Sequence, residues 1–232
     1  MSERILPEPD RFATCPTVGK VLNYYGGTFD AVYVLLHPFI HPISIAKELF
    51  KPSSYPDRRS IIANCEPVPW TRVMSLSNLP SIAAIDIALR TNIGGLKKEL
   101  NNEAYGNRLD TLYDSHDVVP PSEGNFSDLI HNQVLALFQE LGHKWAWVGD
   151  DLCTERKLYW IEDLKTQHSA ATAGHCNVFA ADKSLLYTTH WDSHFSFLCG
   201  SQAALSRITQ NANFEGFFCE PNTDVYWSVH ET

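Results

Sequence analysis

Several signatures that assign a function at once are missing from this chain. None of its six cysteines forms a C-x-x-C pair, which excludes the common zinc-ribbon and dithiol redox motifs. No G-x-G-x-x-G segment and no P-loop is present, so the sequence offers no cradle for a dinucleotide or a nucleotide phosphate. The nucleophile elbow G-x-S-x-G and the zinc-protease motif H-E-x-x-H are missing as well.

Basic charge and long apolar runs are also scarce. The chain has 18 Lys and Arg against 27 Asp and Glu, and its formal charge of −9 argues against nucleic acid or an anionic membrane as a partner. No apolar stretch reaches the roughly 18 residues that a membrane span requires. No signal-peptide core follows Met1. We therefore expect a soluble cytoplasmic protein with free thiols, whose partner is a protein or a small molecule.

The composition is that of an ordinary globular protein with both helix and strand patterns. Hydrophobic residues make up 44% of the 232 residues, enough for a sizeable core. Helical spacing of apolar residues marks 81–91, with Ser81 as its N-cap, and 127–141, with Gly142 after its end. Strand patterns mark 31–36 and much of the last sixty residues. This pattern predicts an α+β fold: a helical N-terminal half, then a mainly antiparallel sheet with helices packed on one side.

We expect residues 1–232 to form a single domain. The best internal boundary lies near 113–125, where the chain is polar, contains Pro120-Pro121 and ends in Gly124. This boundary would separate sub-domains rather than independent domains.

The densest concentration of reactive side chains lies in 185–200, where His190, Asp192 and His194 fall within five residues. The segment can be one continuous strand or a hairpin that turns at 191–193. The usual strand length and the turn preference of Asp and Ser favour the hairpin. Both geometries predict that the two imidazoles lie close together.

This cluster has three interpretations. Two imidazoles and a carboxylate are a ligand set for zinc or for non-haem iron, and His175 and His230 are further candidate ligands in the same strand-rich region. Without metal, a histidine oriented by Asp192 could act as a general acid or base. In the third interpretation the cluster is only the tip of a hairpin.

Two other features accompany the cluster. His37 and His41 each precede a proline, and the sequence does not place them relative to His190. Aromatic residues concentrate in the last hundred residues, and Trp191, Tyr226 and Trp227 are candidates for a ligand groove or an interface.

Parts of the chain resemble a known protein family. The segments 137–142, 147–150 and 186–195, with His37-Pro38-Phe39 and Pro69-Trp70, are similar to a family of uncharacterised bacterial proteins that carries a domain-of-unknown-function label. The resemblance implies a cytoplasmic bacterial protein of one domain. It implies no activity and no site residues.

These observations favour a non-enzymatic binding or interaction module, with an immunity- or regulation-type role. One alternative is a metal-dependent enzyme, a hydrolase or a non-haem iron enzyme, centred on His190, Asp192 and His194. The other alternative is a small-molecule pocket lined by aromatic residues.

Overall fold

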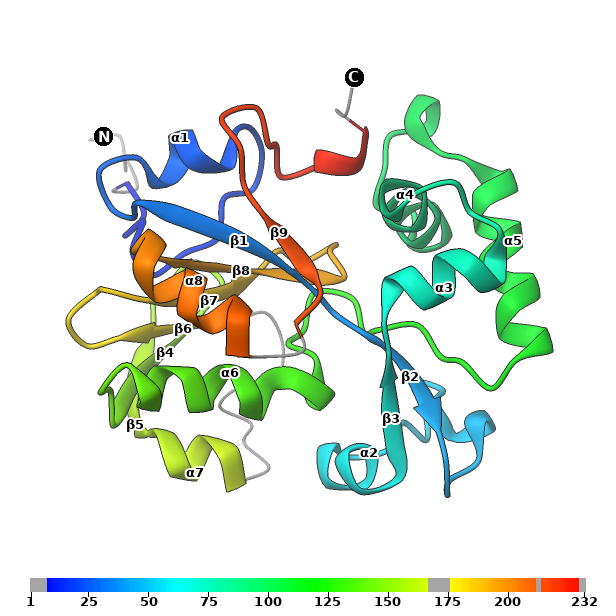
Figure 1. Ribbon diagram of the computed structural model, residues 1–232, viewed down its shortest axis with the longest axis horizontal. Coiled ribbons are helices and arrows are strands. Elements are labelled where there is room, and N and C mark those ends of the chain that lie inside the picture. The colour runs from blue at the N-terminus through cyan, green and yellow to red at the C-terminus, as the bar shows by residue number, and fades with distance from the viewer. Residues whose placement is uncertain (1–7, 167–175, 212–213, 230–232) are drawn as a thin grey trace, which may run out of the picture.

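A computed structural model describes residues 8–166, 176–211 and 214–229. Within these ranges seven strands form one sheet in the order β5-β4-β6-β7-β8-β1-β9, and every neighbouring pair is antiparallel (Figure 1). The α+β class and the mainly antiparallel sheet are therefore confirmed. The strands are β1 Ala31–Leu36, β4 Trp145–Asp150, β5 Arg156–Trp160, β6 Cys176–Ala180, β7 Leu186–Thr189, β8 Phe195–Gly200 and β9 Gly216–Phe218.

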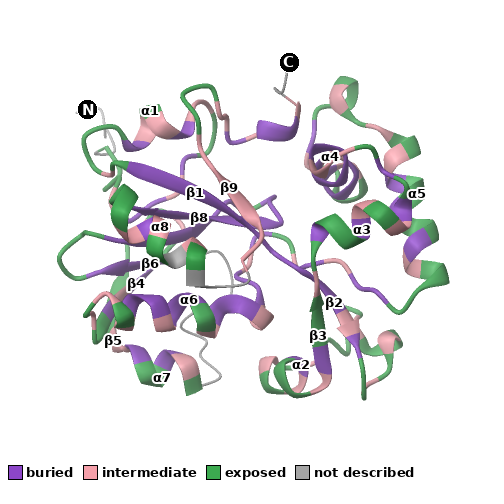
Figure 2. Ribbon diagram, viewed as in Figure 1, coloured by how far each residue is buried: buried purple, intermediate pink, exposed green. Residues whose placement is uncertain are grey.

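Alternating side chains of β1 enter two different hydrophobic cores. Val32, Val34 and Leu36 belong to one core, and the intervening side chains belong to the other. Helices contribute to both cores, so the sheet is buried on both faces along most of its width (Figure 2). The first core contains α1 Val21–Tyr25, α3 Trp70–Ser77, α4 Ile82–Ile93 and α5 Glu103–Ser115, and the second contains α6 Asp128–Glu140, α7 Ile161–Thr166 and α8 Gln202–Asn211.

Two parts of the predicted architecture are wrong. The N-terminal half is not purely helical, because β1 lies inside the sheet and pairs with β8 and β9 from the other end of the sequence. Helices do not pack on one side only, since both cores contain them. The pattern of six successive apolar residues in β1 already fits a strand covered on both faces.

A smaller sheet stands apart from the main one. Strands β2 Phe39–Pro42 and β3 Cys65–Val68 pair with each other, and helix α2 Arg58–Asn64 leads into β3. Their own small core contains Ile40, Ile61, Cys65 and Val119. Short 3-10 helices complete the described chain: η1 Lys47–Leu49, η2 Lys98–Leu100 and η4 Trp227–Val229.

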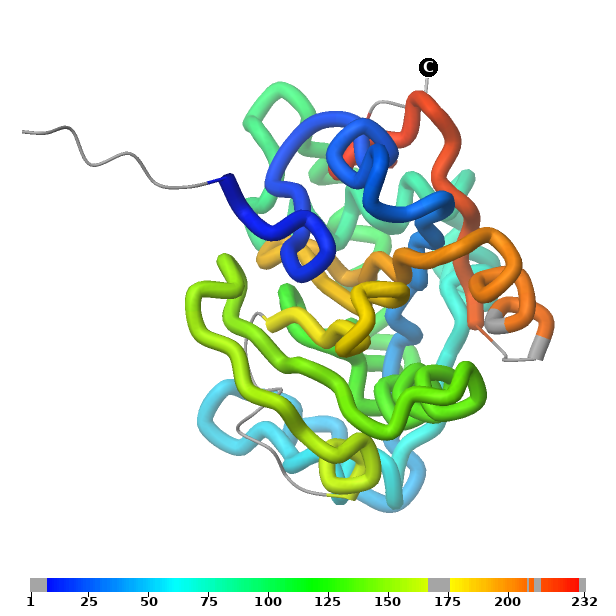
Figure 3. Tube along the Cα trace, turned by 90° about the vertical axis from the view of Figure 1, so that its left-hand side faces the viewer, coloured from blue at the N-terminus to red at the C-terminus, as the bar shows by residue number. Residues whose placement is uncertain are grey.

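The predicted hairpin is confirmed. Strands β7 and β8 pair with Leu186 opposite Cys199 and Thr189 opposite Ser196, so residues 190–194 form the connecting loop. The hairpin lies in the middle of the sheet, whereas the β4–β5 hairpin lies at its margin (Figure 3). Among the described residues no helix is both long enough and apolar enough to cross a bilayer.

Candidate functional site

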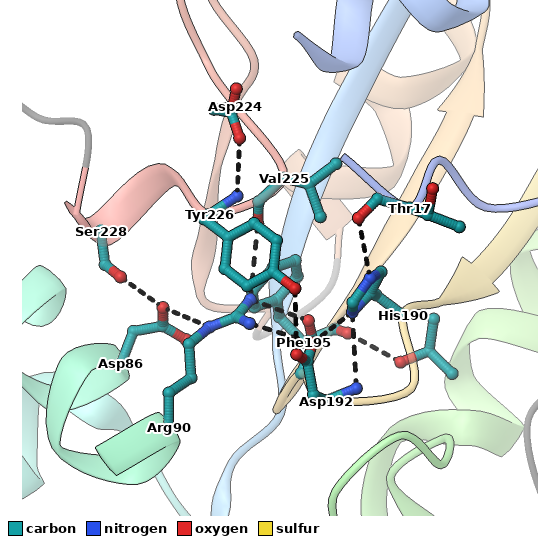
Figure 4. A network of polar contacts seen from close by, with 12 residues as sticks. Thr17, Asp86, Arg90, His190, Asp192, Phe195, Asp224, Val225, Tyr226 and Ser228 are labelled. Atoms are coloured by element: carbon teal, nitrogen blue, oxygen red, sulfur yellow. Dashed lines mark hydrogen bonds and ion pairs between the residues drawn. The ribbon is translucent and has the colours of Figure 1, made fainter. Parts of the chain in front are cut away.

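The loop of the β7–β8 hairpin contacts a buried arginine of α4. Arg90 is fully buried, and its guanidinium reaches three different parts of the chain (Figure 4). Its Nε donates to Asp86 Oδ2 at 3.0 Å, its Nη1 to Asp192 Oδ1 at 3.1 Å, and its Nη2 to Ser193 Oγ at 2.9 Å. Nη2 also lies 3.4 Å from the carbonyl oxygen of Val225. We call Arg90, Asp86, Asp192, His190 and the groups bonded to them the Arg90 network.

Helix α4 places two members of this network on one face. Ser81 accepts a hydrogen bond from Ala84 N and caps the helix, as predicted. Asp86 and Arg90 are four residues apart, so their side chains meet one turn apart. Ser228 Oγ donates to Asp86 Oδ2 at 2.6 Å, which ties the C-terminal segment to the helix. The other oxygen of Asp86 is buried and has no hydrogen-bond partner among the described residues.

Asp192 is the acceptor at the centre of the network. Besides Arg90, it contacts Nδ1 of His190 and accepts a hydrogen bond from the Tyr226 hydroxyl at 3.1 Å. Burial alone would raise the pKa of Asp192, but His190, Arg90 and Tyr226 together hold that pKa below its ordinary value. The carboxylate is therefore ionised at neutral pH, and both of its oxygens are engaged.

The ring of His190 is also engaged at both nitrogens. Its Nε2 lies 3.1 Å from the carbonyl oxygen of Thr17, and its Nδ1 faces the Asp192 carboxylate. The backbone N–H of Asp192 also lies 3.4 Å from Nδ1, so each ring nitrogen has a polar neighbour within the protein. Its faces contact Trp191, at 4.1 Å between ring centroids, and Tyr226, at 5.7 Å.

His194 belongs to different surroundings. The ring of His194 makes no hydrogen bond to Asp192 or His190, all three of which the structure describes, and its Nδ1 is buried without a partner. Its neighbour is His37, whose backbone N–H donates to the His194 carbonyl at 3.0 Å. The sequence left the position of His37 open, and the structure brings it beside the hairpin. His41 instead bonds the carbonyl of Asp117.

His37, His131 and His194 form what we call the histidine group. Burial lowers the pKa of each ring to about 3. Nearby positive charge adds to the lowering of the pKa: His194 acts on His37, Arg58 and His37 act on His131, and Arg90 acts on His194, where Asp192 opposes it. His37 Nε2 bonds Ser196 Oγ at 2.7 Å, but both nitrogens of His131 lack partners in the described chain. The ring of His131 stacks on Phe126 instead. All three rings are uncharged at neutral pH.

The predicted metal ligands differ in the contacts that they make. His190 and Asp192 are together, His194 faces the histidine group, and His175 and His230 lie outside the described residues. Among the described residues no three His, Cys, Asp or Glu side chains are placed so that they could hold a metal ion. The zinc or iron site therefore stays a prediction.

Cys176 and Cys199 are buried in strands of the main sheet. All six cysteines are free. Burial raises the pKa of Cys176 to about 12 and that of Cys199 well above its ordinary value. Both thiols therefore stay protonated at neutral pH, which does not suit a nucleophile.

Arg90 is not among the site residues predicted from the sequence, although it bonds Asp192 and Ser193 of the hairpin loop. The available signal was a pair of opposite charges four residues apart, Asp86 and Arg90, inside the apolar stripe of a helix. Such a pair on an apolar face indicates a buried ion pair, but the partner in the hairpin loop, 102 residues further on, cannot be read from local spacing.

Two surface hollows flank the network. The larger one, about 330 Å³ in volume, lies beside Tyr226, and we call it the Tyr226 hollow. A smaller one, about 120 Å³, lies beside His190 and Trp191. Trp191 lines the smaller hollow and is 42% exposed. Trp227 is buried and packs on Phe217 in the first core. The Tyr226 hollow is lined by Val18, Gly19, Gly95, Leu96, Lys97, Leu100, Asp224, Tyr226 and Val229.

The comparisons with known proteins identify the family without an activity. No curated protein matches this chain, and no solved structure does. One family model covers residues 18–229, which include the histidine group, all the strands described above and the Arg90 network apart from Thr17. The chain therefore belongs to the family described as "Protein of unknown function (DUF2711)".

Proposed function

We propose that this protein is a non-enzymatic binding module that holds a small organic molecule in the Tyr226 hollow. One observation carries the proposal. The reactive groups of the His190–Asp192 pair are fully engaged with protein atoms, while Lys97 and Asp224, of opposite charge, line an open hollow directly beside them.

The engagement of Asp192 argues against a catalytic role for this carboxylate. A general base must accept a proton from its substrate, and a metal ligand must turn a lone pair to the ion. Either use would take Asp192 away from Arg90 or Tyr226. Removing one partner of a buried ion pair is strongly unfavourable, because the other charge stays buried and unpaired. The network is better suited to hold the wall of a binding site rigid.

Tyr226 connects the network to the hollow. Its hydroxyl donates to Asp192, and its ring lies against the Arg90 guanidinium, with 4.6 Å between Arg90 Cζ and the ring centroid. In the segment between α4 and η2, Gly95 comes so close to Asp192 that a side chain there would touch the Asp192 Cβ. The wall formed by Gly95 and Tyr226 is therefore fixed by buried contacts before any ligand arrives, which lowers the entropic cost of binding.

The lining residues indicate the class of ligand. Lys97 offers a cation and Asp224 an anion. Leu96, Leu100 and Val229 supply apolar surface. A volume of about 330 Å³ lies at the lower end of the range for small-molecule sites. We infer a ligand of amino-acid size that carries at least one charged group and an apolar part.

A second hollow of about 330 Å³ is less suited to this role. It is lined mainly by apolar residues such as Leu36, Pro38 and Ile130. Its carboxylate, Glu215, already accepts hydrogen bonds from the backbone N–H groups of Trp70 and Thr71. Gln133 is the other polar residue among its described lining residues, and it carries no charge.

Thermal-shift measurements with free amino acids, small carboxylates and amines test the proposal. We expect at least one of them to raise the melting temperature, and Leu100→Trp to abolish the shift by filling the hollow. The chain supplies a matched control, because Lys47–Leu49 and Lys98–Leu100 are both Lys-Glu-Leu turns of 3-10 helix. Leu49→Trp should keep the shift. A shift that survives in Leu100→Trp would place the ligand elsewhere.

Elemental analysis tests the rival, a metal-dependent enzyme. Stoichiometric zinc or iron in the purified protein, lost in a His190→Ala/His194→Ala double variant, would favour the rival over the binding module. A metal-free protein that still shows the ligand-dependent thermal shift would favour the binding module.

A further inference from the structure

Strand β5 is the outermost strand of the main sheet on one side. It pairs only with β4 among the described strands, and its first three residues are exposed. The strand at the other margin, β9, is three residues long, whereas β5 has five. Short edge strands resist association, and longer ones present backbone groups to which another strand can bond.

The hydrogen bonds to β4 fix which backbone groups of β5 point outward. Asp150 N bonds Glu155 O, and Ile161 N bonds Lys144 O, at the two ends of the paired region. Bonded and non-bonded pairs alternate along an antiparallel ladder. Since Trp147 stands opposite Leu158, the residues Arg156, Leu158 and Trp160 occupy non-bonded positions. Their N–H groups therefore point away from β4.

We propose that β5 pairs with β5 of a second copy of this chain, antiparallel about a two-fold axis at Leu158. In this register each Leu158 N–H donates to the Leu158 carbonyl of the other copy. Each Trp160 N–H donates to the Arg156 carbonyl of the other copy. The two edges complement each other because the outward residues fall at every second position, symmetric about Leu158.

The side chains are complementary in the same register. Arg156 faces Trp160 of the other copy, and Lys157 faces Tyr159, so each cation meets an aromatic ring rather than a like charge. Within one chain Lys157 Nζ already lies 5.1 Å from the Tyr159 ring centroid. Arg156 keeps its exposed ion pair with Asp10, at 3.1 Å, on its own chain.

The adjoining sheet face supplies apolar area for the contact. Trp145 and Leu158 are 47% and 38% exposed, and Trp145 packs edge-on against Trp160. These residues and Trp147 share one face of the β4–β5 hairpin, because residues opposite each other in a ladder point to the same side. Tryptophan, tyrosine and arginine are the residues that dominate the binding energy of protein interfaces.

Sedimentation or light scattering of the full chain over a concentration series up to about 100 μM tests the proposal. We expect a dimer in equilibrium with monomer. Leu158→Pro should weaken the dimer at least about tenfold, because it removes an outward N–H and no bond to β4. Leu158→Ala is the matched control: it removes the same side-chain contact but keeps the N–H, so it should stay closer to the wild type. A monomeric wild type, or a Leu158→Pro variant that dimerises like the wild type, would overturn the proposal.

A cross-linking variant gives a second readout should Leu158→Pro fail to fold. Bonded antiparallel pairs have Cα atoms about 5.5 Å apart, within the range that a disulfide spans. Leu158→Cys should therefore form a covalent dimer on mild oxidation. Leu152→Cys, exposed in the turn between β4 and β5, is the control and should not. Equal cross-linking of the two variants would contradict pairing at the β5 edge.

Discussion

Arg90 and the three histidines of the histidine group are buried to the same degree, but the protein accommodates them differently. Arg90 stays charged: burial would lower its pKa, yet Asp86 and Asp192 raise the pKa above its ordinary value. The histidines, with a pKa of about 3, stay neutral, and several of their ring nitrogens have no hydrogen-bond partner in the described part of the chain. The Arg90 network thus pairs a buried charge with two carboxylates, whereas the rings of the histidine group carry no charge.

The difference has a consequence for stability. A buried charge that is paired stays stable over a wide pH range, but the protein loses much stability when one partner is removed. A neutral buried histidine tolerates the loss of a neighbour but not protonation, because an imidazolium would have to be solvated. Substitution should therefore damage the Arg90 network most, and acid should damage the histidine group most.

Arg90→Leu should have the largest effect of any single change in these two regions. It leaves the carboxylates of Asp86 and Asp192 in the interior without a cation, and breaking a buried pair in this way typically costs about 3–5 kcal/mol. Urea unfolding at neutral pH measures the loss. Arg90→Lys keeps the charge but not the three-way geometry of the guanidinium, so it should fall between the wild type and Arg90→Leu. A loss below about 1 kcal/mol in Arg90→Leu would show that the network contributes little.

His131→Leu should make the protein less sensitive to acid. Each histidine has a folded-state pKa of about 3 against 6.5 for the free side chain, so the unfolded chain binds more protons below about pH 6.5. The stability that depends on the neutral rings is complete above that pH. It is lost as the pH falls toward 3, at about 1.4 kcal/mol per pH unit for each ring. Removing one ring should spare about 2 kcal/mol of the loss between about pH 7 and pH 5.

Urea titrations of His131→Leu and the wild type at both pH values measure this difference. His116→Leu serves as the control because His116 is exposed at the end of α5, and it should follow the wild type at both pH values. If His131→Leu lost stability with acid as steeply as the wild type, burial of the neutral ring would not be the cause.

The elements that the sequence predicted well depend on local signals. The cap at Ser81, the glycine after α6 and the turn residues between β7 and β8 act within a few residues, and the structure confirms all three elements. The strand pattern of the last sixty residues does not hold at 225–229, where the structure has no strand. Asp224 accepts the backbone N–H of Tyr226, Val229 N bonds Tyr226 O, and the segment turns into the 3-10 helix η4.

Other features could not be predicted because they depend on contacts between distant residues. The place of β1 between β8 and β9 requires pairing with residues far away in the sequence, such as Ala31 with Gly200 and Tyr33 with Phe218. The contacts of the β7–β8 loop have the same origin: Thr17 and Arg90 engage the loop near His190, while His37 adjoins His194. These partners lie more than 100 positions away in the chain, so local spacing does not predict them.

Tyr226→Phe is expected to have the smallest effect. It tests whether Asp192 stays in place when one of its three partners in the Arg90 network is lost. The change removes the hydrogen bond to Asp192 Oδ2 but keeps the ring on Arg90, so Asp192 retains His190 and Arg90 as partners. The free energy of unfolding should fall by only about 1 kcal/mol, the usual contribution of one hydrogen bond.

Because the Tyr226 hydroxyl lowers the pKa of Asp192, this pKa should rise in Tyr226→Phe, and stability should be lost at a slightly higher pH on acidification. Carboxyl resonances of Asp192 followed by NMR through an acid titration measure this shift directly. A loss as large as that of Arg90→Leu would mean that the hydroxyl, and not the guanidinium, holds the carboxylate in place.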